Sequence, residues 1–239
     1  MLIIISKNYK EMSIAAADTL IHEILNKPDL VLALPTGKTP LKMYKLLSKS
    51  YKKKKVDFSK VTSFNLDEYY PIKKTNKNSY SHYMDENLFN HINIKKSNIN
   101  ILNGETNNPR KECDNYERKI KNKIDLAILG IGVNGHIGFN EPGSGFNSKT
   151  RLVSLTKETR KINSKFFRKI KQVPDKALTI GLGTIMSSKK IILLASGKNK
   201  AKAIKHLVQG NLDKNYPASI LKKHNNLVII LDKKAASLL

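Results

Sequence analysis

The sequence predicts an α/β fold: a doubly wound, mostly parallel, Rossmann-like sheet with helices on both faces. Short runs that are apolar at nearly every position, as in strands covered on both faces, alternate with amphipathic stretches along the whole chain. This alternation is typical of strand–helix units that build a parallel sheet. No Pro/Gly/Ser-rich linker and no internal repeat divides the 239 residues, so a single domain, 1–239, is expected.

Each expected strand is an apolar run, and each expected helix is a longer stretch with apolar residues at helical spacing. In chain order, the strands are expected at Leu2–Ile5, Leu30–Leu34, Val61–Phe64, Ile124–Leu129, Ala177–Ile180, Ile191–Ala195 and Leu227–Leu231. The helices between them are expected at Lys10–Leu25, Pro40–Ser50, Ser79–Phe89, Arg110–Asn122, Lys157–Phe167 and Lys198–Gln209. Ligands of such sheets bind beyond the carboxyl ends of strands, so segments that directly follow a strand are candidate sites.

The formal charge of +25 raises the alternative of a nucleic-acid-binding protein. The lysines are scattered, however, and accompany abundant Asn and Ile, whose codons are also AT-rich. The one dense run, 52–55, is expected to be a solvated turn. No RNA-binding or helix-turn-helix signature is present, so we expect no nucleic-acid partner. The charge would still attract an anionic metabolite.

Three features predict a cytoplasmic protein. The run Leu2–Ile5 has no basic leader and is too short for a signal-peptide core. No apolar stretch approaches the roughly 20 residues that span a bilayer, so no membrane partner is expected. Cys113 is the only cysteine, which excludes an intramolecular disulfide and a cysteine metal cluster.

The first candidate segment is Leu34–Pro40, between an expected strand and a helix. Gly37 permits close backbone approach, two threonine hydroxyls can donate hydrogen bonds, and Pro40 suits a first helical turn. Free N–H groups at a helix start favour an anion, so phosphate binding and an ordinary turn with an N-cap threonine are both open. A nucleotide P-loop is excluded, because it needs glycine where Leu32 stands.

The second segment contains two adjacent carboxylates, Asp67 and Glu68, after an expected strand and beside aromatic residues. Burial among these aromatics would raise the pKa of one carboxyl towards that of a working base. A loop aspartate that caps a turn is the alternative.

The third segment is a glycine-rich loop, Gly130–Gly143, directly after an expected strand. Its start matches the dinucleotide fingerprint, but Pro142, Gly143 and Gly145 interrupt the helix that should follow, so a nicotinamide role is excluded. The loop presents His136 beside Asn134 and Glu141, and a histidine can exchange protons near neutrality. Together with Asp67, these residues lack the spacing of a metal motif, so no metal is expected.

These segments resemble the glucosamine-6-phosphate deaminase family in order and spacing up to about residue 230. The most discriminating stretch is Asn134-Gly135-His136-Ile137-Gly138-Phe139-Asn140-Glu141-Pro142. The resemblance continues through Thr159-Arg160, Asn163-Ser164-x-Phe166-Phe167, Val173-Pro174 and 177–184.

The resemblance implies a cofactor-free conversion of glucosamine 6-phosphate, the expected small-molecule partner, to fructose 6-phosphate and ammonia. It implies that His136 assists ring opening, that Asn134 and Glu141 orient it, and that Asp67 moves the C2 proton to C1. The implied phosphate ligands are Thr36, Gly37, Lys38, Thr39, Lys165 and Lys200. The stretch 155–173 resembles a mobile lid.

Several positions depart from the family pattern. Asn134 stands where many members have Asp and cannot supply a charge to an imidazolium, although it could fix the ring tautomer. Lys165 replaces a common Arg and loses its bidentate fork, which predicts weaker phosphate binding. Lys38 replaces a small residue. Val153 stands where regulated forms carry a basic residue, and the C-terminal extension of the long forms is missing, so we expect a non-allosteric monomer or small homo-oligomer.

The nearest alternative is a 6-phosphogluconolactonase-type hydrolase on the same fold. It would need little from Asp67, because lactone hydrolysis abstracts no C2 proton.

Overall fold

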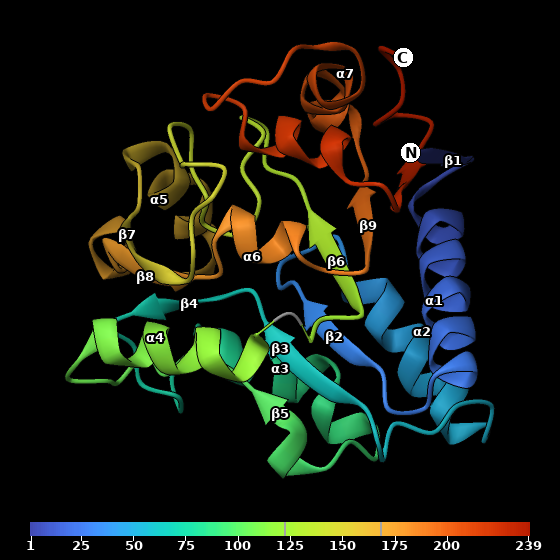
Figure 1. The fold of residues 1–239 in the computed structure, drawn as a ribbon, viewed down its shortest axis with the longest axis horizontal. Coiled ribbons are helices and arrows are strands. Elements are labelled where there is room, and N and C mark those ends of the chain that lie inside the picture. Colours follow the sequence, from blue (N-terminus) through green and yellow to red (C-terminus); the bar gives the residue numbers. More distant parts are fainter. Residues whose placement is uncertain (122, 168) are drawn as a thin grey trace.

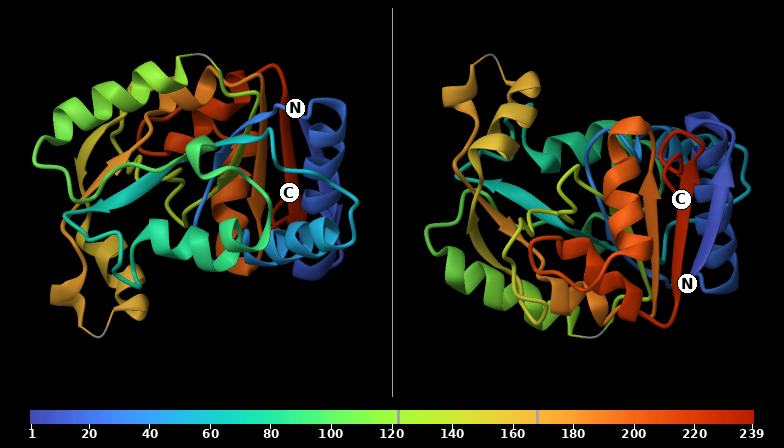
Figure 2. Two further views of the ribbon diagram at one scale, coloured as in Figure 1. Left: turned by 90° about the horizontal axis from the view of Figure 1, so that it is seen from below. Right: turned by 90° about the horizontal axis from the view of Figure 1, so that it is seen from above.

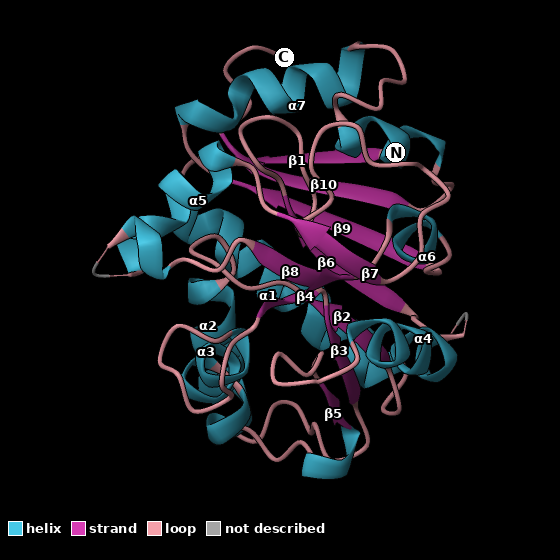
Figure 3. Cartoon of the chain, turned by 90° about the vertical axis from the view of Figure 1, so that its left-hand side faces the viewer, coloured by secondary structure: helices cyan, strands magenta, loops and turns pink. Residues whose placement is uncertain are grey.

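The computed structural model describes residues 1–121, 123–167 and 169–239, and within them a seven-stranded parallel sheet forms the centre of the molecule. The strand order is β1-β10-β9-β6-β2-β3-β5 (Figure 3). In that order the strands are β1 (Leu2–Ser6), β10 (Leu227–Asp232), β9 (Lys190–Ala195), β6 (Leu126–Gly130), β2 (Val31–Leu34), β3 (Thr62–Asn65) and β5 (Ile99–Asn100). From β2 the chain proceeds outward through β3 and β5, and from β6 it proceeds the other way through β9 and β10, with β1 at the edge beyond β10. The pair β2–β6 is therefore the switch point at which such sheets bind ligands.

A second, antiparallel sheet joins the first through Leu66. It consists of β4 (Asp67–Tyr70), β8 (Lys176–Thr179) and β7 (Arg151–Ser154), with β8 in the middle. The backbone N–H of Ile180 donates to the carbonyl of Leu66 at 2.8 Å, which fixes the two sheets at their junction.

Helices cover both faces of the parallel sheet (Figure 1). The α-helices are α1 (Tyr9–Asn26), α2 (Leu41–Lys52), α3 (Tyr80–Asn87), α4 (Pro109–Ile120), α5 (Lys157–Asn163), α6 (Leu182–Met186) and α7 (Ala201–Gln209). Short 3₁₀ turns are η1 (Phe89–His91), η2 (Lys96–Asn98), η3 (Ser164–Phe166), η4 (Ile170–Gln172), η5 (Lys198–Lys200) and η6 (Pro217–Lys223). The helices α1, α2 and α3 pack on one face, and α4, α6 and α7 on the other.

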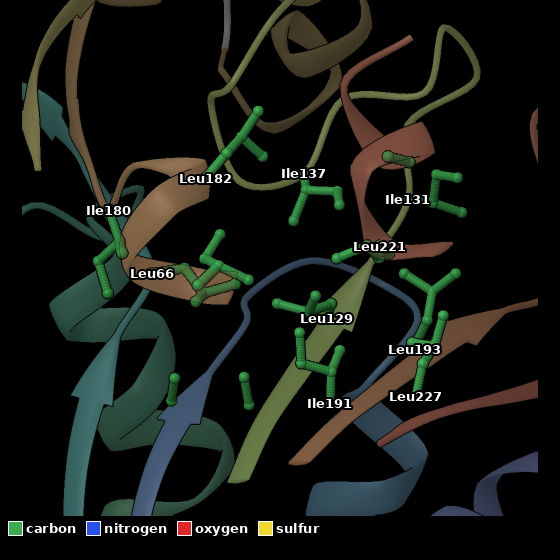
Figure 4. Packing of buried hydrophobic residues seen from close by; sticks show 14 of the residues in the cluster. Leu66, Leu129, Ile131, Ile137, Ile180, Leu182, Ile191, Leu193, Leu221 and Leu227 are labelled. Atoms are coloured by element: carbon green, nitrogen blue, oxygen red, sulfur yellow. The ribbon is translucent and has the colours of Figure 1, made fainter. Parts of the chain in front are cut away.

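Alternating side chains of each central strand build the two hydrophobic cores. In β9, Ile191 and Leu193 point into the core that α4, α6 and α7 cover (Figure 4), whereas Ile192 and Leu194 point into the opposite core. Both faces of β9 are therefore apolar and covered, and this explains why its sequence is continuously apolar rather than alternating.

The expected strands and helices are present to within a few residues, and the doubly wound fold is confirmed. One assignment is wrong in its sheet: the segment Ala177–Ile180 belongs to the antiparallel β8 and not to the parallel sheet. The expected helix end at Asn122 lies outside the described residues. The solvated turn at 52–55 is confirmed by the exposure of its side chains. Within the described residues, no helix has the length and apolar character needed to cross a membrane.

Candidate functional site

A cavity of about 560 Å³ opens where loops leave the carboxyl ends of β2, β3, β6 and β9. The loop 35–39 follows β2, and the loop 130–139 follows β6, so the cavity lies at the switch point between these two strands. Asp67 follows β3, and the loop 196–200 follows β9. The cavity therefore lies where doubly wound sheets bind their ligands.

The loop after β2 forms one wall of the cavity. It contributes Thr36, Gly37, Lys38 and Thr39, all of them predicted. Gly37 has φ = +94°, a left-handed conformation that favours glycine. The helix α2 begins one residue later than expected, with Pro40 at its N-cap and no capping side chain, so the alternative of a turn with an N-cap threonine is wrong. The start of α2 thus keeps N–H groups that favour an anion.

Asp67 and Glu68 occupy different environments. The Oδ2 atom of Asp67 lies 3.2 Å from where a Cβ on Gly138 would be, so a glycine leaves room for this carboxylate. Burial, and next the charge of Glu68, raise the pKa of Asp67 to about 8. Glu68 accepts three backbone N–H hydrogen bonds of 2.8–2.9 Å, two of them from the first turn of α3. Burial raises the pKa of Glu68 to about 7, against the lowering effect of these bonds. Only Asp67 lines the cavity.

His136 lines the cavity from the loop after β6. A Cβ on Gly132 would overlap the imidazole, so this glycine lets the ring lie directly on the backbone. The Nδ1 atom of His136 lies 3.7 Å from Oε2 of Glu141. Burial lowers the pKa of His136, the carboxylate of Glu141 opposes this, and Lys200 lowers the pKa further. The ring is therefore neutral near neutral pH and can accept a proton.

Asn134 and Glu141 hold His136 from behind rather than lining the cavity. The Oδ1 atom of Asn134 accepts the backbone N–H of His136 at 3.3 Å, and its Nδ2 atom donates to Glu141 Oε2 at 3.3 Å. Asn134 thus contacts the backbone of His136 and not its ring, contrary to the expectation that it fixes the tautomer. The hydroxyl of Thr159 donates a hydrogen bond to Glu141 Oε1, which links the loop to α5.

The other two predicted lysines reach the cavity from different elements. Lys165, in η3, is exposed, and Lys200, at the N-cap of α7, is half-buried. Burial lowers the pKa of Lys200. The segment from α5 to η4, which corresponds to the expected lid, stands out from the body of the molecule (Figure 2). Residue 168 of that stretch lies outside the described residues.

Sequence reasoning missed several residues that line the cavity. Ser196 and Asn199 follow β9, and the Ser196-Gly197 pair after an expected strand is a signal that could have indicated them. Tyr80 and Phe139 are stacked, with ring centroids 5.9 Å apart, and form an aromatic wall beside Asp67. No sequence signal indicated that these two rings meet, because they come from segments far apart in the chain.

Comparison with known proteins identifies the family. Residues 7–230 match the family model described as glucosamine-6-phosphate isomerases/6-phosphogluconolactonase. The chain belongs to this family. A glucosamine-6-phosphate deaminase of Clostridium novyi (strain NT) is 56% identical over 233 residues, which are 97% of this chain and 97% of that protein. One of Thermoanaerobacter sp. (strain X514) is 51% identical over 241 residues, covering 100% of this chain and 95% of the relative.

Solved structures of the same family agree with the fold. The structure of a monomeric glucosamine-6-phosphate deaminase superposes with a TM-score of 0.98 at 42% identity and covers 100% of both chains. A 6-phosphogluconolactonase from Trypanosoma cruzi has a TM-score of 0.79 at 20% identity, covering 100% of this chain and 96% of that one. The second likeness concerns the fold alone. In the described residues of this family member, no three His, Cys, Asp or Glu side chains are grouped to hold a metal ion.

Proposed function

We propose that this family member converts glucosamine 6-phosphate and water to fructose 6-phosphate and ammonia, without a cofactor. One observation carries the proposal: a carboxyl of raised pKa, Asp67, and a neutral imidazole, His136, line the same cavity. The start of α2 adjoins the same cavity and Lys200 lines it, and both would attract a phosphate. The names of relatives that are 51–56% identical support the same activity.

His136 serves the opening of the sugar ring. As a neutral base it takes the proton of the hydroxyl at C1, and as an acid it returns a proton to the ring oxygen. The carboxylate of Glu141, near Nδ1, stabilises the imidazolium that exists between these steps. The remaining nitrogen, Nε2, is then the atom that exchanges protons with the sugar. The product of this step is the open-chain aldehyde.

Asp67 then moves a proton within the open chain. Its carboxylate takes the proton from C2 while the ammonium group of the substrate gives a proton to the carbonyl oxygen at C1, which leaves a neutral enolamine with a hydroxyl at C1. Asp67 then returns its proton to C1, which gives a protonated imine at C2. Water adds to this imine, and the carbon–nitrogen bond breaks to release ammonia and leave the ketone. The raised pKa makes Asp67 a stronger base when ionised, and its ionised fraction grows as the pH rises towards 8.

We further propose that the chain acts as a cytoplasmic monomer and that the stretch 155–173 closes over the sugar as a lid. The 42% identical structure of a monomeric deaminase supports the monomeric state. The position of Thr159 and Ile162 on the rim of the cavity supports the lid, because their movement would exclude water from the proton transfers.

The experiment compares ammonia release from glucosamine 6-phosphate and from galactosamine 6-phosphate with hydrolysis of 6-phosphogluconolactone. We expect ammonia from the wild type with at least one amino sugar, and a loss of roughly 10²–10⁴-fold in Asp67→Asn. Lactone hydrolysis without ammonia release, unaffected by Asp67→Asn, would instead establish the lactonase alternative.

A further inference from the structure

Three tyrosine hydroxyls converge on the carbonyl groups of the loop after β2. Tyr44 donates to the carbonyl of Pro35 at 2.5 Å, Tyr83 to that of Gly37 at 2.6 Å, and Tyr9 to that of Lys38 at 3.0 Å. Three of four consecutive carbonyls in the loop are therefore held by side chains. The three donors come from three helices, α1, α2 and α3.

The hydroxyls approach the loop from the side away from the cavity. Residues 36–39 line the cavity, whereas none of the three tyrosines does. In a planar trans peptide, the carbonyl of one residue and the N–H of the next point in opposite directions. Each tyrosine therefore turns a carbonyl away from the cavity and the following N–H, that of Thr36, Lys38 or Thr39, towards it.

This orientation favours an anion for two reasons. A carbonyl oxygen that faced a phosphate would repel it, whereas an N–H group would donate a hydrogen bond to it. Among the described residues, no backbone or side-chain group accepts the N–H of Thr36 or Thr39.

Tyr9 has a second contact that couples the loop to α2. While its hydroxyl donates to the carbonyl of Lys38, it accepts the N–H of Lys42, in the first turn of α2, at 3.2 Å. Pro40 gives this helix no side-chain cap, so Tyr9 supplies from a distant element the acceptor that an N-cap residue normally provides. The start of α2 and the loop are thus fixed to one side chain.

Burial keeps two of the hydroxyls protonated. It raises the pKa of Tyr44 well above its ordinary value, and it does the same for Tyr83. Both side chains therefore remain hydrogen-bond donors at neutral pH.

We propose that Tyr9, Tyr44 and Tyr83 are positioning residues that orient the loop 36–39 for the phosphate of the substrate. This proposal deepens the proposed function and rests on it for the identity of the ligand. The tyrosines do not touch the substrate; they act through the peptide groups that do. The sequence motif of the loop contains none of them.

The test measures binding of glucitol 6-phosphate, which carries the phosphate but has no ring to open, by isothermal titration calorimetry. We expect Tyr83→Phe, which removes one hydrogen bond, to weaken binding by about 3- to 10-fold, and Tyr9→Phe, which removes two, to weaken it by at least as much. In ammonia release, the change should fall on KM, with a much smaller effect on kcat. If the tyrosines had a merely structural role, the variants would have a lower melting temperature but no selective increase in KM over the change in kcat.

Tyr70→Phe is the matched control, because its hydroxyl also donates to a loop carbonyl, that of Thr106, away from the cavity. Tyr44 is fully buried, so Tyr44→Phe is informative only if the variant folds, and the decision rests on the other two. Dissociation constants of Tyr9→Phe and Tyr83→Phe within twofold of the wild type would overturn the proposal. So would a wild type that does not bind the probe.

The two proposals can fail separately. Probe binding that depends on Tyr9 and Tyr83, in a protein that releases no ammonia, would support the positioning role and contradict the deaminase. Ammonia release by the wild type, together with unchanged probe binding in Tyr9→Phe and Tyr83→Phe, would support the deaminase and contradict the positioning role.

Discussion

Asp67 and Glu68 show how position decides the role of two identical functional groups. The carboxylate of Glu68 is surrounded by backbone donors, which hold it as part of the scaffold. Asp67 has no such donors among the described residues, faces the cavity, and carries a pKa raised to about 8 by burial. A buried carboxyl with a raised pKa destabilises the folded protein when it is ionised. Such a cost in stability is expected of a catalytic residue.

Asp67→Asn is therefore expected to stabilise the protein while it lowers the activity by the roughly 10²–10⁴-fold given above. Between pH 3.8 and about 8, the folded wild type holds a proton that the unfolded chain has released, so its free energy of unfolding falls as the pH rises. Asparagine does not titrate. The stability advantage of the variant should be near zero at pH 4 and grow towards pH 8, by at most about 1.4 kcal/mol for each pKa unit of the shift.

Thermal unfolding of both proteins between pH 4 and pH 8.5 measures this difference. Glu68→Gln is the neighbouring control, and we expect it to be less stable than the wild type at pH 8, because its amide NH₂ would face a backbone donor. An Asp67→Asn protein that is no more stable than the wild type at pH 8 would contradict the raised pKa.

At Asn134 a charge can be added, whereas Asp67→Asn removes one. In Asn134→Asp a carboxylate replaces the amide that donates to Glu141, and two carboxylates then lie close to His136. We expect the pKa of His136 to rise, because both charges stabilise the imidazolium. An NMR titration of the imidazole resonances measures this, with Asn134→Ser as the control that removes the amide without adding charge. An unchanged or lower pKa would show that the introduced carboxyl group is neutral or turned away from the ring.

At the scale of elements, the apolar runs predicted the central strands because those strands are buried on both faces. The strand β4 was not predicted, since its sequence, Asp67-Glu68-Tyr69-Tyr70, is polar and aromatic and suggests a loop. β7, with alternating exposure, and the two-residue β5 also lack the apolar signal. β8 has that signal, but its antiparallel partners are β4 and β7, so its sheet could not be assigned before they were known.

In the candidate site, too, some residues could be predicted from the sequence and others could not. Motifs that directly follow strands indicated Asp67, His136 and the loop 36–39, and the structure brings these residues to one cavity. Motifs could not indicate contacts between distant elements. The link from Thr159 to Glu141 and the hydroxyl of Tyr83 on the carbonyl of Gly37 depend on how α5 and α3 pack.

The link between α5 and the histidine loop leads to a prediction about the proposed lid. Thr159→Val keeps the branched shape but removes the hydroxyl that donates to Glu141. A hydrogen bond to a charged group contributes about 1.5–3 kcal/mol, so the loss should loosen α5 and misplace the carboxylate behind His136. We expect faster amide hydrogen exchange in 157–163 and a fall in kcat/KM of roughly tenfold or more.

Thr159→Ser is the control for this change, because it retains the hydroxyl and should keep most of the activity. If amide hydrogen exchange in 157–163 and kcat/KM are both the same in Thr159→Val as in the wild type, the contact between Thr159 and Glu141 does not hold the lid.

At the scale of the whole molecule, the chain has a formal net charge of +25, and its cavity is proposed to receive a doubly charged phosphate. Long-range attraction should concentrate the substrate at the cavity, and salt should weaken this attraction, since the Debye length is about 10 Å at 0.1 M. We expect kcat/KM for glucosamine 6-phosphate to fall by roughly tenfold between about 0.02 and 0.5 M sodium chloride, mainly through KM.

A charge variant separates long-range attraction from direct contact with the cavity lysines. Lys52 ends the 12-residue helix α2, and Lys53, Lys54 and Lys55 follow it. All four are exposed, and the helix places them about 18 Å from its end nearest the cavity. Changing all four to glutamine lowers the net charge without touching the site. If the whole field acts, kcat/KM of this variant will fall less steeply with salt than that of the wild type. An identical slope would show that the charges of these four exposed lysines have no part in substrate capture.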